Sequence, residues 1–525
     1  MSPLRGRASG PHAGKRLSLW RLLLGVGAVS VVAVGGVFGV RWVAAQAVVQ
    51  SFDDPWFAAY VDVTLTPTYN FGDPADESEA SVVLAFLTAP TGGQACEPSW
   101  GGAYSLSEAA RDLDLDRRIA RLRDAGGDVV LSFGGAAGVE LATACDTADQ
   151  TRAAYAAAID RYDVEVIDLD IENDDLADAA AAQRRAEAVA QLQETRDLQV
   201  WLTLPVSPTG LTADGIDQVR QFLAAGVDLA GVNAMTMDYG VDLDGRSMAA
   251  VNDSALEGLH AQLDALYAEA DDAQADAVLW AKIGTTPMIG QNDIPAEVFT
   301  LADAEAVNAS AHAQGLGRVS MWSLNRDRSC SDNYAVTSVV SNLCSGVDQG
   351  DLTFAGVLDA GFSAPAARAT TTASPSPTAS PEPTTPVDDP ATSPYPIWGE
   401  NTRYLAGTKT VWHGNVYEAK WWTQGDQPDD PLTVAADSPW TLIGPVLPGE
   451  KPYEIPTVPE GTYDEWDGAA DYEAGDRVEF EGLPFEAKWW TSGDSPAAIG
   501  DDPDGSPWRA LTAAEVAEVA AGADD

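Results

Sequence analysis

The chain contains few basic residues and very few histidines. Its 525 residues include 30 Lys and Arg against 80 Asp and Glu, which gives a formal net charge of -50. Such an acidic surface repels nucleic acid and favours a neutral or cationic partner. None of the four histidines lies near a cysteine at the spacing of metal ligands. We therefore expect neither a metal site nor a cofactor.

Cysteine is equally scarce, with four residues in the whole chain. Four cysteines allow three pairings, and sequence alone does not choose among them. An exported chain favours disulfides, so we expect two, each closing a loop region: Cys96 with Cys145 and Cys330 with Cys344. Metal binding is the alternative, and the shortage of histidine disfavours it.

The N-terminal region predicts export. Residues 1–21 carry five Lys or Arg and no acid, and Leu22 to Val40 is a run of nineteen apolar or small residues. As a helix this run measures roughly 28 Å, close to the thickness of a membrane core. We predict a basic cytoplasmic arm (1–21) and a transmembrane anchor (22–42), which makes a single-pass cell-membrane protein with the remainder outside. The alternative is a signal peptide cleaved near Val43 to Ala45, followed by secretion.

The length predicts several domains, and the first of them has the pattern of parallel βα units. Between Phe57 and about Leu358, short apolar runs alternate with amphipathic helical patterns such as Leu115 to Ala125 and Leu176 to Glu194. The predicted strands are Phe57 to Leu65, Val82 to Leu87, Val129 to Phe133, Val164 to Ile171, Gln199 to Pro205, Gly231 to Met237, Val278 to Gly284 and Arg318 to Leu324. Eight strands predict an α/β fold, a (β/α)₈ TIM barrel over residues 53–362. A doubly wound open sheet is the alternative.

One predicted strand carries a row of acids. Asp168, Asp170 and Glu172 alternate with apolar residues in Val164 to Ile171 and the residues just after it, so their carboxyl groups face the same way. Burial and like charge at such a row drive the pKa values apart, as acid catalysis requires. In a barrel, function collects at the carboxyl ends of strands, where Glu172 lies. The alternative is an edge strand with a solvated acidic face.

The C-terminal part contains a linker and a repeat. Residues 363–393 are rich in Pro, Ser and Thr and predict an extended linker. Beyond it, landmark residues recur at a fixed offset, for example 508 − 440 = 68 for two tryptophans. The other pairs are Trp398 and Trp466, Tyr404 and Tyr472, Gly407 and Gly475, and the segments 419–423 and 487–491. We predict two small β-rich modules (394–446 and 462–512), joined by a linker (447–461) and followed by an acidic tail (513–525).

Tryptophan is abundant and clusters in these modules. The chain has 16 Trp, a distribution that suits stacking on sugar rings as well as core packing. Each module is close to the size below which a domain needs disulfides or a metal ion to fold, so its aromatic residues must also form its core. Adjacent Trp421 and Trp422 on a strand point to opposite faces, which predicts one buried ring and one exposed ring. Burial of both is the alternative.

The acidic row resembles the D-x-x-D-x-D-x-E signature of glycoside hydrolase family 18, the chitinases and their relatives. Other landmarks follow in order: Ser132-Phe133-Gly134-Gly135 is similar to the family's S-x-G-G turn, Met235 to Tyr239 to its M-x-Y-D run, and Met321 to Leu324 to the run whose Trp floors the cleavage subsite. The first signature position is Glu165 where Asp is usual. The strand-six Tyr is replaced by Met237. Because two residues along a strand keep the same side, we expect Tyr239 to take its place, and impaired turnover is the alternative.

This resemblance implies a retaining, substrate-assisted mechanism. Glycosidic cleavage needs a protonated acid, and Glu172 is our candidate, with its pKa raised by Asp170. In the family scheme the substrate's own 2-acetamido oxygen is the nucleophile, Asp170 orients the acetamido N–H, and Asp168 shares a proton with Asp170. The predicted substrate contacts are Met235, Asp238, Tyr239 and Trp322. Trp322 is the predicted stacking platform, with a barrel-core role as its alternative, and we expect Trp100 to extend the cleft.

Both modules resemble the carbohydrate-binding modules of families 5 and 12, small chitin binders, through the A-K-W-W-T-x-G-D-x-P pattern and a downstream S-P-W. The resemblance implies that exposed rings stack on chains of β-1,4-linked N-acetylglucosamine. The predicted chitin-binding residues are Tyr404, Trp421, Trp422, Tyr472, Trp489 and Trp490.

The sequence therefore predicts a monomeric, membrane-anchored chitinase that binds chitin and N-acetylglucosamine oligomers. One alternative is a chitin-binding lectin or adhesin with an inactive barrel, which the presence of Glu172 disfavours. A second is an endo-β-N-acetylglucosaminidase, which the twin modules disfavour because they suit an insoluble polymer.

Overall fold

The computed structural model describes residues 55–519, apart from short gaps at 92–95, 332–333, 335, 337, 363–387, 431–432, 434–436, 453–457, 460, 481, 498–505, 512–514 and 517–518. The predicted cytoplasmic arm and membrane anchor lie outside the described residues, as does most of the predicted Pro/Ser/Thr linker. No helix within the described part of the chain is both long and apolar enough to cross a membrane.

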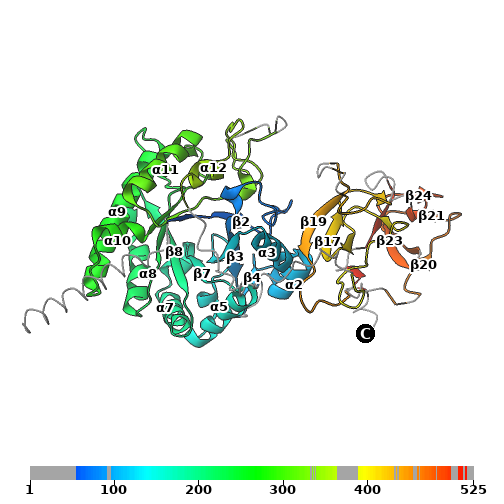
Figure 1. The fold of residues 1–525 in the computed structure, drawn as a ribbon, viewed down its shortest axis with the longest axis horizontal. Coiled ribbons are helices and arrows are strands. Elements are labelled where there is room, and N and C mark those ends of the chain that lie inside the picture. The colour runs from blue at the N-terminus through cyan, green and yellow to red at the C-terminus, as the bar shows by residue number, and fades with distance from the viewer. Residues whose placement is uncertain are drawn as a thin grey trace, which may run out of the picture.

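The first domain is a closed parallel barrel (Figure 1). Its strands are β1 (Trp56–Phe57) with β2 (Ala59–Asp62), β3 (Ser81–Thr88), β6 (Asp128–Gly134), β7 (Val166–Asp170), β8 (Gln199–Ser207), β10 (Gly231–Met235), β11 (Ile283–Thr286) and β14 (Arg318–Val319). Each pairs in parallel with the next, and the circle closes because β1 pairs with β14 while β2 pairs with β3. The predicted TIM barrel is confirmed, and the open sheet is wrong.

Helices surround the barrel. The longer ones are α3 (Leu115–Asp124), α5 (Ala148–Tyr162), α7 (Ala179–Gln193), α8 (Ala213–Ala224), α9 (Met248–Glu269) and α11 (Leu301–Gln314); the shorter ones are α2 (Leu106–Asp112), α4 (Leu141–Ala144), α6 (Asn173–Ala177), α10 (Asp276–Ala281) and α12 (Phe354–Asp359). Strand alternation explains the layering: Ile167 and Leu169 of β7 join the large apolar cluster shared with the helices, whereas Asp168 between them faces the barrel interior.

The seventh strand differs from its prediction. We expected Val278 to Gly284, but residues 276–281 form α10 and the strand begins at Ile283. A short apolar run fits a buried helix turn as well as a buried strand, so periodicity does not distinguish them.

Trp100 is not part of a cleft. It lies in β4 (Ser99–Trp100), which pairs with β3 and with β5 (Tyr104–Ser105), and its side chain is fully buried. Its indole Nε1 donates a hydrogen bond of 2.8 Å to the Tyr162 hydroxyl. The prediction that Trp100 extends the substrate cleft is wrong, because strand pairing turns the ring into the core.

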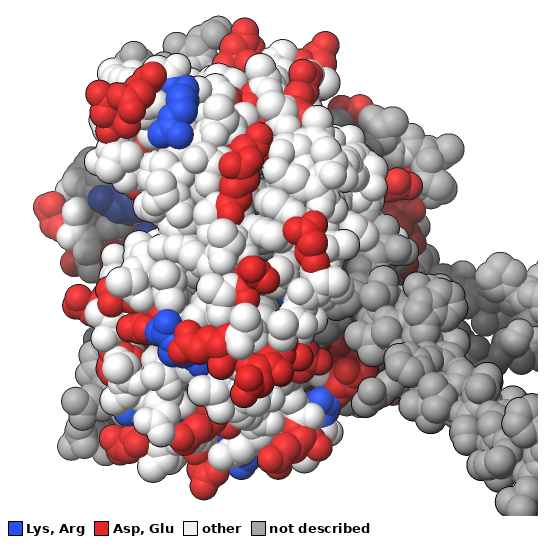
Figure 2. Space-filling view, turned by 90° about the vertical axis from the view of Figure 1, so that its left-hand side faces the viewer, with Lys and Arg blue, Asp and Glu red and all other residues white. Residues whose placement is uncertain are grey.

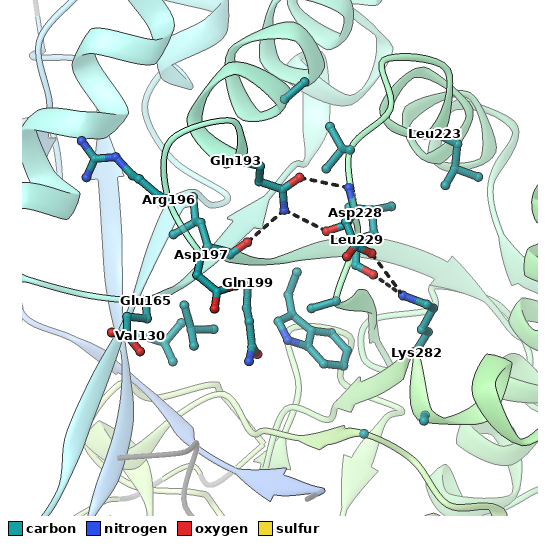
Figure 3. A pocket seen from close by; sticks show the side chains of 18 of the residues that line it. Val130, Glu165, Gln193, Arg196, Asp197, Gln199, Leu223, Asp228, Leu229 and Lys282 are labelled. Carbon is teal, nitrogen blue, oxygen red and sulfur yellow. Dashed lines mark hydrogen bonds and ion pairs between the residues drawn. The ribbon is translucent and has the colours of Figure 1, made fainter. Parts of the chain in front are cut away.

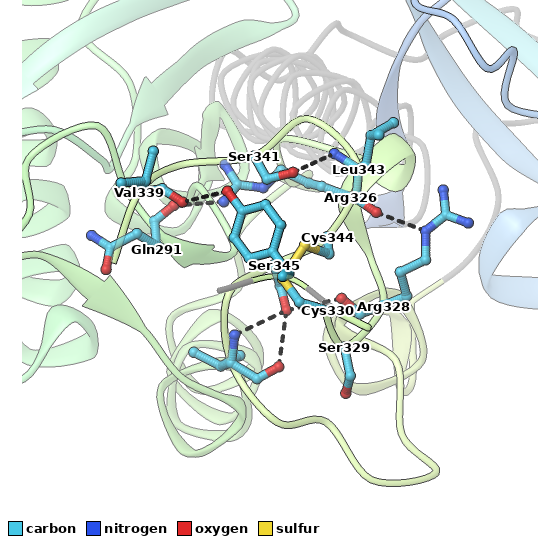
Figure 4. Close-up of a disulfide and its surroundings, with 12 residues drawn as sticks. Gln291, Arg326, Arg328, Ser329, Cys330, Val339, Ser341, Leu343, Cys344 and Ser345 are labelled. Atoms are coloured by element: carbon cyan, nitrogen blue, oxygen red, sulfur yellow. Dashed lines mark hydrogen bonds between the residues drawn. A yellow bond between two sulfur atoms is a disulfide. The ribbon is translucent and has the colours of Figure 1, made fainter. Parts of the chain in front are cut away.

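Both predicted disulfides are confirmed, Cys96 with Cys145 and Cys330 with Cys344. Figure 4 shows the second pair, which lies within the loop that follows β14 and links two of its parts. Next to it, the backbone N–H groups of Ser345 and Gln291 donate to the carbonyl groups of Arg328 and Ser345, respectively. These bonds join the loop to a hairpin of β12 (Gly290–Gln291) and β13 (Val298–Phe299) near the mouth of the barrel.

The two C-terminal modules have the same architecture. The first contains β15 (Arg403–Tyr404), β16 (Lys409–Trp412), β17 (Asn415–Ala419), β18 (Thr423–Gln424) and β19 (Trp440–Pro445), and the second contains β20 (Asp464–Glu465), β21 (Asp471–Tyr472), β22 (Arg477–Phe480), β23 (Leu483–Ala487), β24 (Thr491–Ser492) and β25 (Trp508–Ala510). Trp440 and Trp508 each donate an indole hydrogen bond to an equivalent carbonyl group, at 3.0 and 2.8 Å.

The predicted acidic tail is not separate from the second module. Val516 is buried and packs with Val458 and Leu511. Glu515 accepts hydrogen bonds from Arg509, at 2.7 and 2.9 Å. Apolar contact and an ion pair therefore hold the start of this segment on the module.

Acidic side chains are spread over the side of the barrel that faces away from the modules, with only a few Lys and Arg between them (Figure 2). The sequence-level excess of acid is thus visible on the folded surface, as expected for solvated carboxylates.

Candidate active site

Asp168 lies at the centre of a buried polar cluster inside the barrel. Its Oδ1 accepts hydrogen bonds of 2.6 Å from both Thr203 and Arg318, and its Oδ2 accepts from Tyr60 at 2.8 Å and Ser132 at 2.7 Å. These side chains come from strands β2, β6, β8 and β14 and are fully or almost fully buried. Both oxygens of Asp168 are therefore occupied by donors.

Sequence analysis missed Arg318 and Tyr60. Arg318 is fully buried, forms an ion pair with Asp168 and lies 5.6 Å from the Tyr60 ring. A signal was present, because Arg318 and Trp322 are four residues apart in one predicted strand and so share a face. If Trp322 faces the barrel interior, then Arg318 faces it too. A buried charge there needs an oppositely charged or hydrogen-bonding partner.

Asp170 is a buried carboxyl group with a strongly raised pKa. It is buried, and its Oδ1 has no hydrogen-bond partner among the described residues. Burial, then the negative charges of Glu172 and Asp168, raise the pKa of Asp170 well above its ordinary value, against the opposing effect of Arg318. This increase favours the protonated form of Asp170.

Glu172 follows β7 at the carboxyl end of the strands, as the N-cap residue of α6, and its side chain makes no capping hydrogen bond. Burial, and after it the charge of Asp238, raise the pKa of Glu172 to about 7. We had expected Asp170 to cause this increase. The causes of the increase are burial and the charge of Asp238, and Asp170 is not among them.

The glycine turn after β6 brings the third strand close to the acidic strand. A side chain at Gly134 would place its Cβ 2.0 Å from the Asp170 carbonyl oxygen, and one at Gly135 would lie 2.7 Å from the Phe86 ring. The N–H of Gly135 donates to the Asp170 carbonyl group at 2.9 Å. These glycines therefore allow the backbone to approach the acidic row closely.

An aromatic group lies at the same end of the barrel. Trp322 is half-buried and stacks on Phe86, with ring centroids 5.4 Å apart, and meets the Tyr60 ring edge-on at 5.9 Å. Phe86 comes from the end of β3 and was not predicted. Because Trp322 is partly exposed and packs directly over Tyr60, it lies above the Asp168 cluster, where a ring can form the floor of a sugar site.

Strand β10 ends earlier than predicted, at Met235, which is half-buried. Asp238 then adopts a left-handed conformation with φ of 46°. Its Oδ1 accepts a hydrogen bond of 3.1 Å from the Ile294 N–H, and burial raises its pKa. Asp238 is thus fixed by the β12–β13 hairpin and lies close enough to act on the charge of Glu172.

Tyr239 lies beside Glu297, and its hydroxyl group is buried. Its hydroxyl is buried without a hydrogen-bond partner among the described residues, and burial followed by the charge of Glu297 raises its pKa. Its N–H donates to Glu297 at 2.9 Å. The expectation that Tyr239 keeps the side of Met237 assumed a continuous strand, and that assumption is wrong because the strand ends at Met235.

Each module carries at least one exposed tryptophan on its surface. Trp421, Trp489 and Trp490 have exposed fractions of 46%, 45% and 56%. In the first module Trp422 is half-buried, but in the second both adjacent rings are exposed. The predicted alternation does not hold there, because the paired tryptophans lie in a bend between two strands and not within one.

Tyr404 belongs to the core of the first module, and Tyr472 is partly buried and packs against the core of the second. Tyr404 is 3% exposed and packs edge-on against Trp440, with ring centroids 5.0 Å apart. Tyr472 packs in the same way against Trp508 at 5.1 Å, and its hydroxyl accepts a hydrogen bond from the Asp467 N–H. The prediction of Tyr404 as a chitin contact is therefore wrong, because its ring is not accessible to a polymer.

A cavity of about 1380 Å³ lies at the opposite end of the barrel (Figure 3). It is lined by residues before or at the starts of strands, among them Trp56, Glu165 and Gln199. Lys282 reaches into it and donates a hydrogen bond of 2.5 Å to the Leu229 carbonyl group. Glu172 is at the other end of the same strand set, so this cavity is separate from the acidic cluster.

No group of three or more His, Cys, Asp or Glu side chains is arranged to hold a metal ion within the described part of the chain. In the acidic row, hydrogen-bond donors surround Asp168, and the pKa of Asp170 is raised. The arrangement therefore suits proton transfer.

Comparisons with known proteins agree with this arrangement. Residues 465–509 match the carbohydrate-binding module family 5/12. Over 284 residues the chain is 39% identical to a probable bifunctional chitinase/lysozyme of Escherichia coli K12 and 38% identical to endochitinase 11 of Metarhizium anisopliae. Each match covers 52% of this chain but only 31% and 52% of the respective relative, so the chain spans about half or less of the length of these relatives.

The barrel also resembles a solved structure. The catalytic domain of a hyperthermophilic chitinase from Pyrococcus furiosus is 30% identical, with a TM-score of 0.51. The similarity covers 58% of this chain and 94% of that domain. Fold and sequence thus agree over the region that contains the acidic row.

Proposed function

The chain belongs to glycoside hydrolase family 18, the family of the chitinases, and from this we propose that it hydrolyses the β-1,4 bonds between N-acetylglucosamine residues of chitin. The single observation that carries the proposal is the pair of carboxyl groups at the mouth of the barrel: Asp170, which is buried and has a raised pKa, and Glu172, whose pKa is about 7. An acid with this pKa is protonated in a large fraction of molecules near neutral pH, which is what cleavage of a glycosidic bond needs.

Glu172 acts as the acid in the first step. Its proton passes to the glycosidic oxygen as the bond from C1 to that oxygen breaks, and the shorter chain leaves with a new hydroxyl group. The carbonyl oxygen of the substrate's 2-acetamido group attacks C1 and forms an oxazolinium ion. In the second step water attacks C1, the Glu172 carboxylate takes a proton from it, and the ring opens. Two inversions at C1 give overall retention.

Asp170 orients the acetamido group and Asp168 fixes the base of the row. As the oxazolinium forms, the acetamido nitrogen becomes positively charged, and a carboxyl group beside it that can ionise lowers the energy of that state. Asp168 is held by Arg318, Tyr60, Ser132 and Thr203, so it supplies a constant negative charge below Asp170. Trp322 and Asp238 are the proposed contacts to the sugar at this site.

The modules hold the enzyme on its polymer. Exposed Trp421, Trp489 and Trp490 offer flat faces to sugar rings, and stacking on a neutral sugar does not require a basic surface. When one module is bound to the polymer, the effective concentration of chitin near the other module is high. We therefore expect the two modules together to bind chitin much more strongly than either module alone.

We also propose that residues 22–42 retain the enzyme at the membrane with its barrel and modules outside. The support is the basic arm followed by nineteen uncharged residues. Mass measurement of the N-terminus in a membrane fraction tests this. An intact N-terminus in that fraction is expected, and a mature chain that begins near Ala45 in the medium would establish secretion instead.

Hydrolysis of colloidal chitin tests the function itself. We expect release of short N-acetylglucosamine oligomers whose first-formed reducing ends are the β-anomer when followed by proton NMR. A control substrate, the same polymer after deacetylation, should not be cut, because it lacks the acetamido nucleophile. Chitin binding without any release, or release of the α-anomer first, would contradict the proposal.

A further inference from the structure

The first module rests directly on a barrel helix. Arg117 of α3 is 4% exposed, although α3 is on the outside of the barrel. Its Nη2 forms an ion pair of 2.6 Å with Glu450, and its Nη1 donates a hydrogen bond of 2.5 Å to the Pro445 carbonyl group. One turn further along α3, Arg121 donates to the Leu442 carbonyl group. The strand β19 therefore lies along α3, as Figure 1 shows.

A second ion pair crosses the same contact. Lys409 of the module lies 2.5 Å from Asp114, which precedes α3 and is 6% exposed. Burial alone would lower the pKa of Lys409, but the charge of Asp114 and the hydrogen bond to it, together with Tyr395 and Glu418, outweigh burial and raise the pKa. Asp114 is buried and Lys409 is half-buried, so the two matched charges are largely shielded from solvent, and loss of one partner is costly.

The backbone of the module is shaped for this contact at Gly444. A Cβ at this position would lie 2.7 Å from the Arg117 carbonyl oxygen and 2.8 Å from its Cγ. At the offset of 68, the second copy has Thr512 in place of Gly444. The second copy could not lie on a helix in the same way without moving its backbone.

The second copy uses the corresponding face for its own C-terminal segment. Arg477, the equivalent of Lys409, pairs with Glu486 at 2.9 Å, and Arg509, the equivalent of Thr441, pairs with Glu486 and Glu515 at 2.6 and 2.7 Å. The basic residues of this face are therefore satisfied within the module. One repeat thus has two different surroundings, a barrel helix for the first copy and its own tail for the second.

We propose that the two modules have different tasks: the first is a fixed extension of the barrel that orients the polymer relative to Glu172, and the second is the independent anchor. This inference rests on the proposed function. A module docked through Arg117, Arg121 and Lys409 holds Trp421 in one position relative to the barrel, whatever the length of the linker between residues 363 and 387. The fixed position of Trp421 should affect hydrolysis of a polymer that is bound by the first module and the active site at the same time. It should not affect hydrolysis of a short soluble oligomer, which is bound only at the active site.

Arg117→Glu and Lys409→Glu test the proposal in the full chain, since each places an acid opposite an acid. In each variant we expect small-angle X-ray scattering to give a larger radius of gyration. Hydrolysis of insoluble chitin should fall by about tenfold, because a docked module raises the effective concentration of the polymer at the active site. Turnover of soluble oligomers should be unchanged. Arg117→Glu combined with Glu450→Arg should restore both quantities in part. Arg196→Glu, which breaks an exposed ion pair with Asp160 elsewhere on the barrel, is the control and should change neither.

The outcomes separate the parts of the inference. An unchanged radius of gyration in both single variants would show that the module is not held by these residues. A larger radius with undiminished hydrolysis of insoluble chitin would show that docking does not serve hydrolysis. If the unaltered chain cuts no chitin, the proposed function fails, while the scattering still reports whether the module is docked.

Discussion

The guanidinium group of Arg318 lies 2.6 Å from Oδ1 of Asp168 inside the barrel, and neither side chain is accessible to solvent. Arg318 belongs to the last strand and Asp168 to the fourth, so the ion pair spans the interior. It supports Asp168 below the two carboxyl groups that we propose do the chemistry.

Removal of this guanidinium group should destabilise the protein strongly. Arg318→Met leaves a buried carboxylate without its ionic partner, for which we expect a loss of about 3–5 kcal/mol in the free energy of unfolding. Chemical denaturation measures it. The control is Arg196→Met, which removes an exposed ion pair and should cost about 1 kcal/mol or less. Equal losses in the two variants would show that Arg318 is not a buried ionic support.

The charge of Asp238 should set the alkaline limit of activity. Glu172 must be protonated to act as an acid, so activity is present below its pKa of about 7 and falls as the pH rises through that value. Asp238→Asn removes a negative charge that raises this pKa. The alkaline limb of the kcat/KM profile on soluble oligomers should therefore move to lower pH. A limb that stays in place or moves upward would contradict the assigned cause.

Truncation of two aromatic residues of the first module should have different effects, one on chitin binding and the other on folding. Trp421→Ala removes an exposed ring and should weaken chitin binding by about 2 kcal/mol, measured by depletion in a chain where Trp489 and Trp490 are also Ala. Tyr404→Ala removes a core ring and should unfold the module, at a cost of about 3–5 kcal/mol. Near-ultraviolet circular dichroism distinguishes lost binding from lost folding. Binding loss in Trp421→Ala that comes with lost tertiary signal would argue against a contact role.

The sequence was enough to predict the barrel, because alternation at β7 and the order of apolar runs follow directly from strand geometry. It also predicted the repeat, whose fixed offset does not depend on structure. It misplaced the seventh strand, because the short apolar run at 278–281 fits a buried helix turn equally well.

The site was predicted only in part, for physical reasons. Asp168, Asp170 and Glu172 are visible as a row, but which of them holds a proton depends on donors from other strands, and Arg318 comes from 150 residues away. Tyr239 was misjudged because the end of β10 and the left-handed Asp238 are set by the β12–β13 hairpin. Trp100 and Tyr404 were misjudged because an aromatic residue in a short segment reads equally well as surface or core.

The most direct measurement compares Glu172→Gln with the unaltered chain on colloidal chitin, in one experiment that follows both released oligomers and bound protein. The side chain keeps its size but has no acidic proton, so the account predicts that release falls by about 10³-fold or more while chitin binding is unchanged. Release by Glu172→Gln at a rate near that of the unaltered chain would contradict the claim that this carboxyl group is the acid.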